Sequence, residues 1–220
     1  MSWRQRLFRE TPQNYSGYNM SSIAYKYGKS LYINMTNRCT ASCTFCIKNK
    51  WAGKFRGNNL RLKKEPTTEQ VIREIKNPKK YSEIVFCGYG EPLLRLEELK
   101  IIAAWIKSKG GKVRVNTSGH ANLVYKRDIT PELEGLVDAV SISLNAANPS
   151  DYRKLHRPAF GLKSYKAVLN FAGKCKKHIK EVTLTCITLP GTDTAGCAKI
   201  AEKLGVNFRL RPYLDSYENS

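Results

Sequence analysis

Three cysteines, Cys39, Cys43 and Cys46, lie within eight residues of one another, directly after a strand-like run at 31–35. Their C-x3-C-x2-C spacing suits three thiolate ligands of a four-iron, four-sulfur cluster, with one iron left without a protein ligand. A structural zinc site normally has four protein ligands, so Cys87 or a histidine would have to complete one here. The spacing and the aromatic Phe45 favour a cluster with an open position for a small molecule.

A glycine-rich turn, Gly88-Tyr89-Gly90-Glu91, follows the second strand-like run. Glycine lets a backbone approach a ligand closely, and the Glu91 carboxylate can accept hydrogen bonds from an ammonium group. The alternative is a plain strand-to-helix turn in which Glu91 stands near a helix start. Because the turn comes one strand–helix unit after the cysteines, we expect it to belong to the same site.

Polar residues also end the third and fourth strand-like runs, at Asn116, Ser143 and Asn145. The C-terminal ends of parallel strands are where ligand sites form in α/β proteins. Ordinary loop capping is the alternative. All three side chains share one side of their runs, so we expect them to line a ligand cavity.

Candidate substrate contacts lie farther from the cysteines. A buried arginine needs an anionic or planar partner, so we expect Arg211 to bind a substrate or a carboxylate, with an internal ion pair as the alternative. Residues 47–66 form a long connection that could cover a ring or be a solvated flap. We expect His156 at the surface or at a helix end. The candidate substrate contacts are Asn34, Trp51, Arg157, Arg211 and Tyr213.

The elements that must position these residues alternate along the chain. The strand-like runs are 31–36, 82–87, 112–117, 138–144, 181–187 and 206–211. The helix-like runs are 67–76, 95–109, 131–136, 163–177 and 193–204. Apolar residues recur at helical spacing from Leu96 to Ile106, and Gly110 follows as a C-terminal cap. Alternating strands and helices predict a parallel sheet.

One side of these strands is polar. It carries Tyr32 and Asn34, Arg114 and Asn116, Ser141 and Ser143, Thr183 and Thr185, and Arg209 and Arg211. A sheet covered by helices on both faces should have nearly continuous apolar strands, and a closed barrel fills its lumen with branched side chains. We therefore expect an α/β fold, a partial (β/α)6 barrel of parallel strands with a polar open lumen and helices on the outer face only.

Length and cysteine content limit the class of protein. The 220 residues suffice for one domain, expected at 29–213, with an N-terminal extension at 1–28, irregular in structure, and a C-terminal tail at 214–220. No run approaches the roughly 20 apolar residues of a membrane span, and the N-terminus does not have the apolar stretch of a secretory signal. Seven cysteines, three of them clustered, favour a reducing, cytoplasmic setting. The other four, Cys87, Cys175, Cys186 and Cys197, are expected to be buried small apolar residues.

Charge points to the kind of partner. Lys and Arg number 38 against 18 Asp and Glu, a net charge of +20. This excess favours an anionic partner such as a phosphorylated metabolite, a nucleotide or RNA. A solvated basic surface is the alternative, because the positive residues are spread along the chain.

Taken together, these motifs resemble the radical S-adenosylmethionine (SAM) superfamily over residues 29–213. The resemblance rests on Cys39, Cys43, Phe45 and Cys46, and on Gly88-Tyr-Gly-Glu91, with Tyr89 where a glycine is common. It implies a [4Fe-4S] cluster on the three cysteines and SAM as the second cofactor. It further implies that Phe45 lines the adenine, that Gly88 to Glu91 contact the methionine amine, and that Asn116, Ser143 and Asn145 contact the ribose and carboxylate.

The sequences of three segments resemble a smaller group within this superfamily. Residues 30–39, 85–93 and 140–145 look like the small TatD-associated group of radical SAM proteins, which includes queuosine lyases. This resemblance implies cleavage of SAM to a 5′-deoxyadenosyl radical, hydrogen abstraction from a nucleoside or nucleotide, and release of queuine from queuosine 5′-monophosphate. It also implies an electron donor such as flavodoxin or ferredoxin.

Two other functions stay open on the residues alone. The same radical chemistry could modify RNA or a peptide, although 220 residues leave no separate RNA-binding domain. The cysteines could instead hold zinc or iron in a non-enzymatic RNA-binding module.

Overall fold

The computed structural model describes residues 21–50 and 53–213 and is built on a seven-stranded sheet. The strands are β1 (Ala24–Tyr27), β2 (Ser30–Ile33), β5 (Ile84–Phe86), β6 (Val113–Thr117), β7 (Ala139–Ser143), β8 (Glu181–Ile187) and β9 (Asn207–Arg211), in that order across the sheet. Strands β2 to β9 are parallel, and β1 pairs with β2 antiparallel. A small hairpin pairs β3 (Lys54–Phe55) with β4 (Asn58–Asn59). The six predicted strands and their parallel pairing are confirmed.

Most of the predicted helices are also confirmed. The α-helices are α2 (Ile47–Lys50), α3 (Thr68–Ile75), α4 (Leu96–Ser108), α5 (Ala121–Tyr125), α6 (Pro149–His156), α7 (Lys163–Cys175) and α8 (Thr194–Leu204). Three 3-10 turns, η1 (Pro78–Lys80), η2 (Pro92–Arg95) and η3 (Thr130–Leu133), complete the described elements. Within the described ranges, every helix is too short or too polar to cross a bilayer.

Two expectations about the elements were wrong, and helices α2, α5 and α6 were not predicted. Residues 24–27 form the edge strand β1, although the segment up to residue 28 was expected to be irregular. The run 131–136 gives only the turn η3, because Gly135 follows it with a φ of 71°. Helix α6 was not predicted, because Tyr152 and His156 are its only buried residues and the rest of the helix is polar.

Two local signals start α6 even though it has little apolar surface. Pro149 occupies the first turn, where its missing N–H leaves no hydrogen bond unmade. The Asn148 side chain accepts a hydrogen bond from the Asp151 amide at 3.0 Å and caps the helix. Arg157 ends it in the left-handed conformation, with a φ of 42°.

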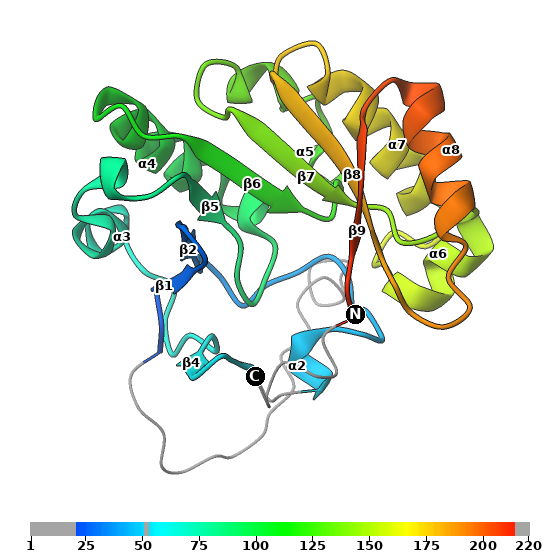
Figure 1. The fold of residues 1–220 in the computed structure, drawn as a ribbon, viewed down its shortest axis with the longest axis horizontal. Coiled ribbons are helices and arrows are strands. Elements are labelled where there is room, and N and C mark those ends of the chain that lie inside the picture. Colours follow the sequence, from blue (N-terminus) through cyan, green and yellow to red (C-terminus); the bar gives the residue numbers. More distant parts are fainter. Residues whose placement is uncertain (1–20, 51–52, 214–220) are drawn as a thin grey trace.

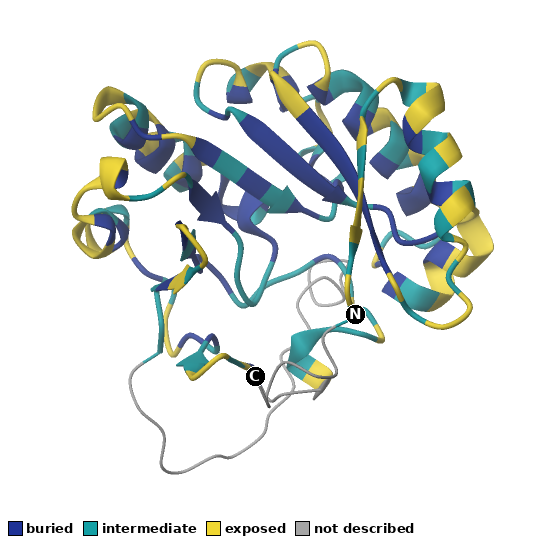
Figure 2. Cartoon of the chain, in the orientation of Figure 1, coloured by how far each residue is buried: buried dark blue, intermediate teal, exposed yellow. Residues whose placement is uncertain are grey.

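The two faces of the sheet differ as the alternation predicted. Ile33, Phe86, Val115, Val140 and Val182 lie side by side in register and belong to the hydrophobic core. Helices α4, α7 and α8 pack along this side (Figure 1), and the middle of the sheet is buried (Figure 2). Because the apolar side is covered by helices, the polar side is left for the site.

The polar face carries charged residues that are partly paired. The Arg114 guanidinium donates two hydrogen bonds to the Glu83 carboxylate, at 2.9 and 2.6 Å. Arg209 donates to the Ser141 hydroxyl at 3.2 Å, and Arg211 to the Ser143 hydroxyl at 3.5 Å. Arg114 thus forms an internal ion pair with Glu83. For Arg211, where an ion pair was the alternative to a ligand contact, the hydrogen-bond partner is a serine.

Candidate functional site

The cysteine segment lies at the C-terminal ends of the parallel strands, between β2 and α2 (Figure 1). Its backbone is bound to the residues that end α6. The Ser42 amide donates to the His156 carbonyl at 3.0 Å, and the Thr44 amide to the Leu155 carbonyl at 2.9 Å. The Ala159 amide donates in return to the Thr40 carbonyl at 2.9 Å. Helix α6, which was not predicted from the sequence, therefore holds the segment that carries the thiols.

The three thiols fit the ligand set of a [4Fe-4S] cluster. All three side chains are half-buried. In the metal-free chain, burial raises the pKa of Cys39 to about 11 and that of Cys43 well above its usual range, so metal binding must displace protons. Over residues 21–50 and 53–213, no three acidic, histidine or cysteine side chains converge on one metal-ion position. The C-x3-C-x2-C spacing in the sequence suits a cluster, whose thiolates each bind a different iron.

The glycines of the turn at 88–91 have a structural reason that the sequence did not reveal. A Cβ atom at Gly88 would collide with the Asn34 side chain, and one at Gly90 with the backbone carbonyls of Thr36 and Arg38. The Glu91 amide also donates to the Arg38 carbonyl at 2.8 Å. The turn thus packs directly on the chain that leads into Cys39.

Replacing Gly90 by alanine is expected to destabilise the fold by about 1–3 kcal/mol, because backbone atoms have to move to admit the methyl group. It should also displace the cysteine segment and lower the iron content after reconstitution. Urea unfolding and iron analysis measure both effects. Gly173→Ala is the matched control, because a Cβ there meets nothing within 4 Å and alanine favours the helix α7. Equal stability of the two variants would contradict the packing argument.

Glu91 is buried, with 4% of its surface exposed, and is already hydrogen-bonded within the protein. Its carboxylate accepts from the Thr117 hydroxyl at 2.8 Å, the Ser118 amide at 2.6 Å and the Leu93 amide at 3.1 Å. Burial raises the pKa of Glu91, although these hydrogen bonds act in the opposite direction. The carboxylate caps η2 and ties the turn to the end of β6, so an ammonium group would use its remaining acceptor capacity.

Asn34 and Tyr89 brace the other side of the turn. The Asn34 amide donates to the Ser22 and Leu60 carbonyls at 3.2 and 2.7 Å, and its oxygen accepts from the Tyr89 amide at 3.0 Å. Asn34 has no exposed surface in this structure, so no part of it is open to a substrate. The Lys48 ammonium lies 4.6 Å from the centroid of the Tyr89 ring.

The polar ends of β6 and β7 lie together, but they differ in exposure. Asn116 accepts from Arg114 at 3.0 Å and is half-buried, as is Ser143. Asn145 is fully buried, with a φ of 55°. Both ends of its amide are occupied, one by the Ile187 amide at 3.0 Å and the other by the His156 ring at 3.2 Å. The predicted contact of Asn145 with SAM stays a prediction, and the side chain offers it no exposed surface here.

Arg211 carries a polar atom that the described residues leave without a partner. Its Nε is covered and makes no hydrogen bond. Burial lowers the pKa of Arg211, and the neighbouring Cys87 acts in the opposite direction. Cys87 is half-buried and lies outside the hydrophobic core, unlike Cys175, Cys186 and Cys197, which were correctly expected there. An unpaired guanidinium N–H on a polar face is a feature that an anionic ligand would satisfy.

The remaining candidates are dispersed. Arg157 is exposed at the end of α6. Tyr213 is half-buried beyond β9, where its amide donates to the Thr188 hydroxyl at 3.3 Å. The Phe45 ring lies perpendicular to the His156 ring, with 5.4 Å between centroids. Trp51 lies outside the described residues.

Two buried histidines behind the cysteine segment were not predicted. His156, expected at the surface or at a helix end, is the last residue of α6, but it is only 1% exposed, with its Nδ1 at 3.4 Å from the Cys43 sulfur. His120 is fully buried and bonds to the Thr40 hydroxyl at 2.9 Å and the Tyr152 hydroxyl at 2.8 Å. The sequence offered one weak signal, a four-residue spacing of Tyr152 and His156 on a polar helix.

His120 is expected to make the stability of the chain depend on pH. Burial lowers its pKa to about 4, from about 6.5 in an unfolded chain. Between these values the unfolded state binds the extra proton, so the free energy of unfolding falls as the pH falls from 6.5 to 4. The slope from one histidine is at most about 1.4 kcal/mol per pH unit. Urea unfolding of the wild type and His120→Gln over this range measures it, and identical slopes would contradict the assignment.

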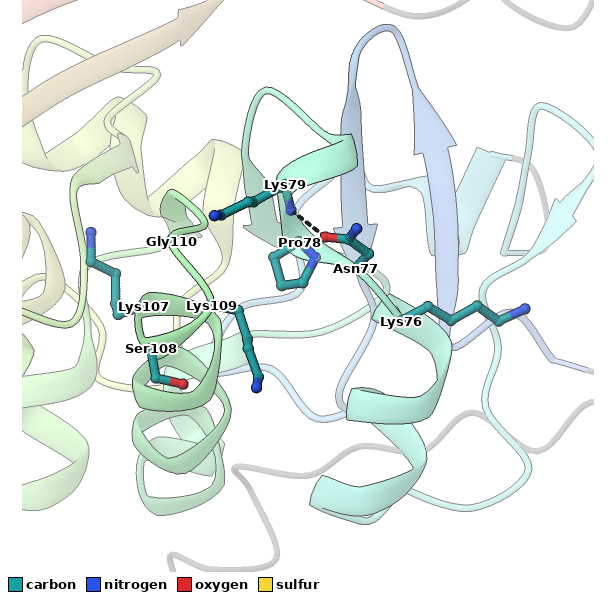
Figure 3. Close-up of a pocket in the computed structure, with 8 residues that line it drawn as sticks. All are labelled: Lys76, Asn77, Pro78, Lys79, Lys107, Ser108, Lys109 and Gly110. Carbon is teal, nitrogen blue, oxygen red and sulfur yellow. Dashed lines mark hydrogen bonds between the residues drawn. The ribbon is translucent and has the colours of Figure 1, made fainter.

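A separate basic pocket of about 700 Å³ lies at the opposite end of the strands (Figure 3). Its walls come from residues 76–79, before β5, and 107–110, before β6. Helices α3 and α4 end there, and the partial negative charge of helix C-termini explains why lysines gather at this place. The pocket contains none of the candidate site residues.

Comparisons with known proteins agree with the cysteine motif. The model of the radical SAM superfamily matches residues 33–204. The dual-specificity RNA methyltransferase RlmN of Buchnera aphidicola subsp. Schizaphis graminum is 27% identical over 202 residues, 83% of this chain and 51% of the relative. The GTP 3′,8-cyclase of Aquifex aeolicus is 26% identical over 189 residues, 85% of this chain and 57% of the relative. The chain thus spans about half the length of these relatives.

Solved structures share the fold at low identity. SuiB of Streptococcus suis, bound to its precursor peptide SuiA, superposes with a TM-score of 0.64 at 14% identity, over 85% of this chain and 40% of SuiB. SuiB bound to S-adenosylmethionine gives 0.60 at 13% identity, over 81% of this chain and 40% of SuiB. Because the family model covers most of the chain and includes all three cysteines, this protein belongs to the radical SAM superfamily, whose members use a [4Fe-4S] cluster and S-adenosylmethionine.

Proposed function

We propose that this protein is a radical SAM enzyme that abstracts a hydrogen atom from a small anionic nucleoside or nucleotide. The favoured reaction is a lyase reaction that releases queuine from queuosine 5′-monophosphate. The proposal of an anionic ligand rests on the Nε of Arg211, on the polar face of the sheet. This atom is covered and has no hydrogen-bond partner among the described residues. The resemblance of residues 30–39, 85–93 and 140–145 to the TatD-associated group supports a nucleotide as the substrate.

In this proposal Cys39, Cys43 and Cys46 hold the cluster. When bound, the cluster supplies the electron that cleaves SAM into methionine and a 5′-deoxyadenosyl radical. The chain supplies position and the exclusion of water. The turn at 88–91 hydrogen-bonds to the chain before Cys39 through the Arg38 carbonyl, and it is the backbone that we propose for the methionine amine. A flavodoxin or ferredoxin is the proposed electron donor.

Residues at the strand ends would contact the rest of SAM and the substrate. Asn116 and Ser143 keep partly exposed polar groups on the same face as Arg211. The sequential order of the parallel strands, with helices packed against the apolar side, supports a sheet that curves into a partial barrel around this face. Arg114 is already neutralised by Glu83, so Arg211 is the better partner for a phosphate or a carboxylate.

The test is anaerobic reconstitution with iron and sulfide, followed by SAM, dithionite and queuosine 5′-monophosphate. We expect 5′-deoxyadenosine and queuine in comparable amounts by mass spectrometry. Formation of 5′-deoxyadenosine without queuine would keep the radical chemistry and overturn the substrate. Absence of 5′-deoxyadenosine from a fully iron-loaded chain would overturn the enzymatic function itself.

RNA modification is a second candidate, supported by the RlmN relatives and by the net charge of +20. If RNA is the substrate, affinity should fall steeply with salt, because phosphate contacts release counterions. Filter binding with transfer RNA and ribosomal RNA fragments from 50 to 200 mM salt tests this. Salt-independent or undetectable binding would leave the nucleotide as the better substrate class.

A further inference from the structure

His156 connects the cysteine segment to the sheet through both of its ring nitrogens. Its Nδ1 lies 3.4 Å from the Cys43 sulfur, across 113 positions of sequence. Its Nε2 lies 3.2 Å from the side-chain nitrogen of Asn145, at the end of β7. The backbone carbonyl of the same residue accepts from the Ser42 amide at 3.0 Å. One residue thus contacts both the backbone and a thiol of the segment.

The hydrogen bonds of Asn145 decide which ring nitrogen carries the proton. The Asn145 oxygen accepts from the Ile187 amide at 3.0 Å, which fixes the orientation of the amide group. Its nitrogen, a donor only, therefore faces His156. The Nε2 of His156 then accepts this bond, which leaves the proton of the neutral ring on Nδ1. The ring also hydrogen-bonds to the Leu144 backbone. A carbonyl only accepts, so in this tautomer that bond shares the Nδ1–H group with the Cys43 sulfur. The Nδ1–H group then points at the Cys43 sulfur as a donor.

Packing holds the ring in this orientation. The Tyr152 ring stacks on it, with 4.2 Å between centroids and 14° between planes, and the Phe45 ring packs perpendicular to it. The Tyr152 hydroxyl is fixed in turn by His120, which bonds to Thr40 beside Cys39. His156 is 1% exposed, so water does not compete for the bond.

We propose that His156 is a positioning residue of the cluster, which donates its Nδ1–H to the Cys43 thiolate and raises the reduction potential. A hydrogen bond to a ligand sulfur stabilises the more negative, reduced cluster and therefore favours electron uptake. The inference rests on ligation of the cluster by Cys43. In this proposal His156, which is not a ligand, helps to set the potential at which the cluster takes up the electron for SAM cleavage.

Three variants at this position separate the two nitrogens. Asparagine places an N–H near the position of Nδ1, glutamine places its amide near Nε2, and phenylalanine keeps only the stacked ring. We expect His156→Gln and His156→Phe to shift the midpoint potential of the reconstituted chain to more negative values. At a fixed potential, the ratio of reduced to oxidised cluster should fall about tenfold, which is about 59 mV for one electron. His156→Asn should stay near the wild type.

The measurement is a redox titration followed by electron paramagnetic resonance, with iron content determined for each sample. His178→Gln is the control, because the His178 ring bonds to the Glu134 carboxylate at 2.7 Å, outside the cysteine segment. Loss of cluster from the Gln and Phe variants alone would also support the positioning role. An Asn variant that matches the Gln and Phe variants in potential and iron content would overturn it.

Histidine-selective ¹⁵N spectra of the full wild-type chain test the same bond without any substitution. The proton on Nδ1 of His156 is the expected result, and a proton on Nε2 would overturn the proposal even if every variant failed to fold. A wild-type chain that binds iron but gives no 5′-deoxyadenosine would contradict the proposed function while leaving these two measurements valid. Failure of the proposed function and failure of the His156 proposal are therefore distinguishable.

Discussion

Replacing Cys43 by alanine is expected to reduce 5′-deoxyadenosine formation from SAM to the background of the assay. The thiolate is one of three ligands, and its loss frees a second iron of the cluster from the protein. Removal of an outer partner of a metal ligand already lowers affinity or activity about 10- to 100-fold, so loss of a ligand itself should exceed that range. Chromatographic detection of 5′-deoxyadenosine after anaerobic reconstitution, with iron and sulfide analysis, measures the effect.

Cys175→Ala is the matched control for this substitution. Cys175 is fully buried in the hydrophobic core at the end of α7, away from the cysteine segment. Its replacement should lower the free energy of unfolding by about 1 kcal/mol and leave iron content unchanged. Retention of turnover by Cys43→Ala, at the level of the control, would refute ligation by this residue.

Replacing Arg211 by methionine is expected to weaken binding of the anionic ligand and to stabilise the ligand-free chain. A hydrogen bond to a charged group contributes about 1.5–3 kcal/mol, which corresponds to roughly 10- to 100-fold in affinity. Because burial already lowers the pKa of Arg211, its charge is unfavourable until an anion joins it. Removing the charge should therefore raise the melting temperature without ligand and reduce the shift that the ligand causes.

Calorimetric titration with SAM and with queuosine 5′-monophosphate distinguishes the two anions that Arg211 could bind. Loss of affinity for SAM alone assigns it to the methionine carboxylate, and loss for the nucleotide alone assigns it to the phosphate. Arg209→Met is the control, because Arg209 is exposed and bonds to Ser141. Equal affinities of the Arg211 variant and the wild type for both ligands would show that the unpartnered Nε has no role in binding.

The roles assigned to two asparagines show where residue type alone is ambiguous. Asn34 and Asn145 are polar residues at strand ends, the places where ligand contacts were expected. Both are fully buried, and every hydrogen bond they make goes to another part of the chain. A buried amide that joins loops has the same sequence signature as an amide that binds a ligand, because both need a polar residue where strand pairing stops.

The sequence by itself predicted the six parallel strands, their alternation and the cysteine motif, because these depend on local period and spacing. A period of two placed Val140 and Ile142 against the helices and Ser141 and Ser143 on the other face, and the register confirms it. The triad at Cys39, Cys43 and Cys46 indicated the family because its signature residues lie close together in the chain, and the family model spans all three.

Only the tertiary structure decided what surrounds those ligands. His156 reaches Cys43 from 113 residues away, on a helix too polar to show an apolar face, and Arg38 and Thr36 leave no room for a side chain at Gly90. These contacts arise when the cysteine segment docks on the end of α6 and on the turn at 88–91. Local periodicity carries no information about which distant surfaces meet, so the environment of the cluster ligands could be found only once the chain was folded.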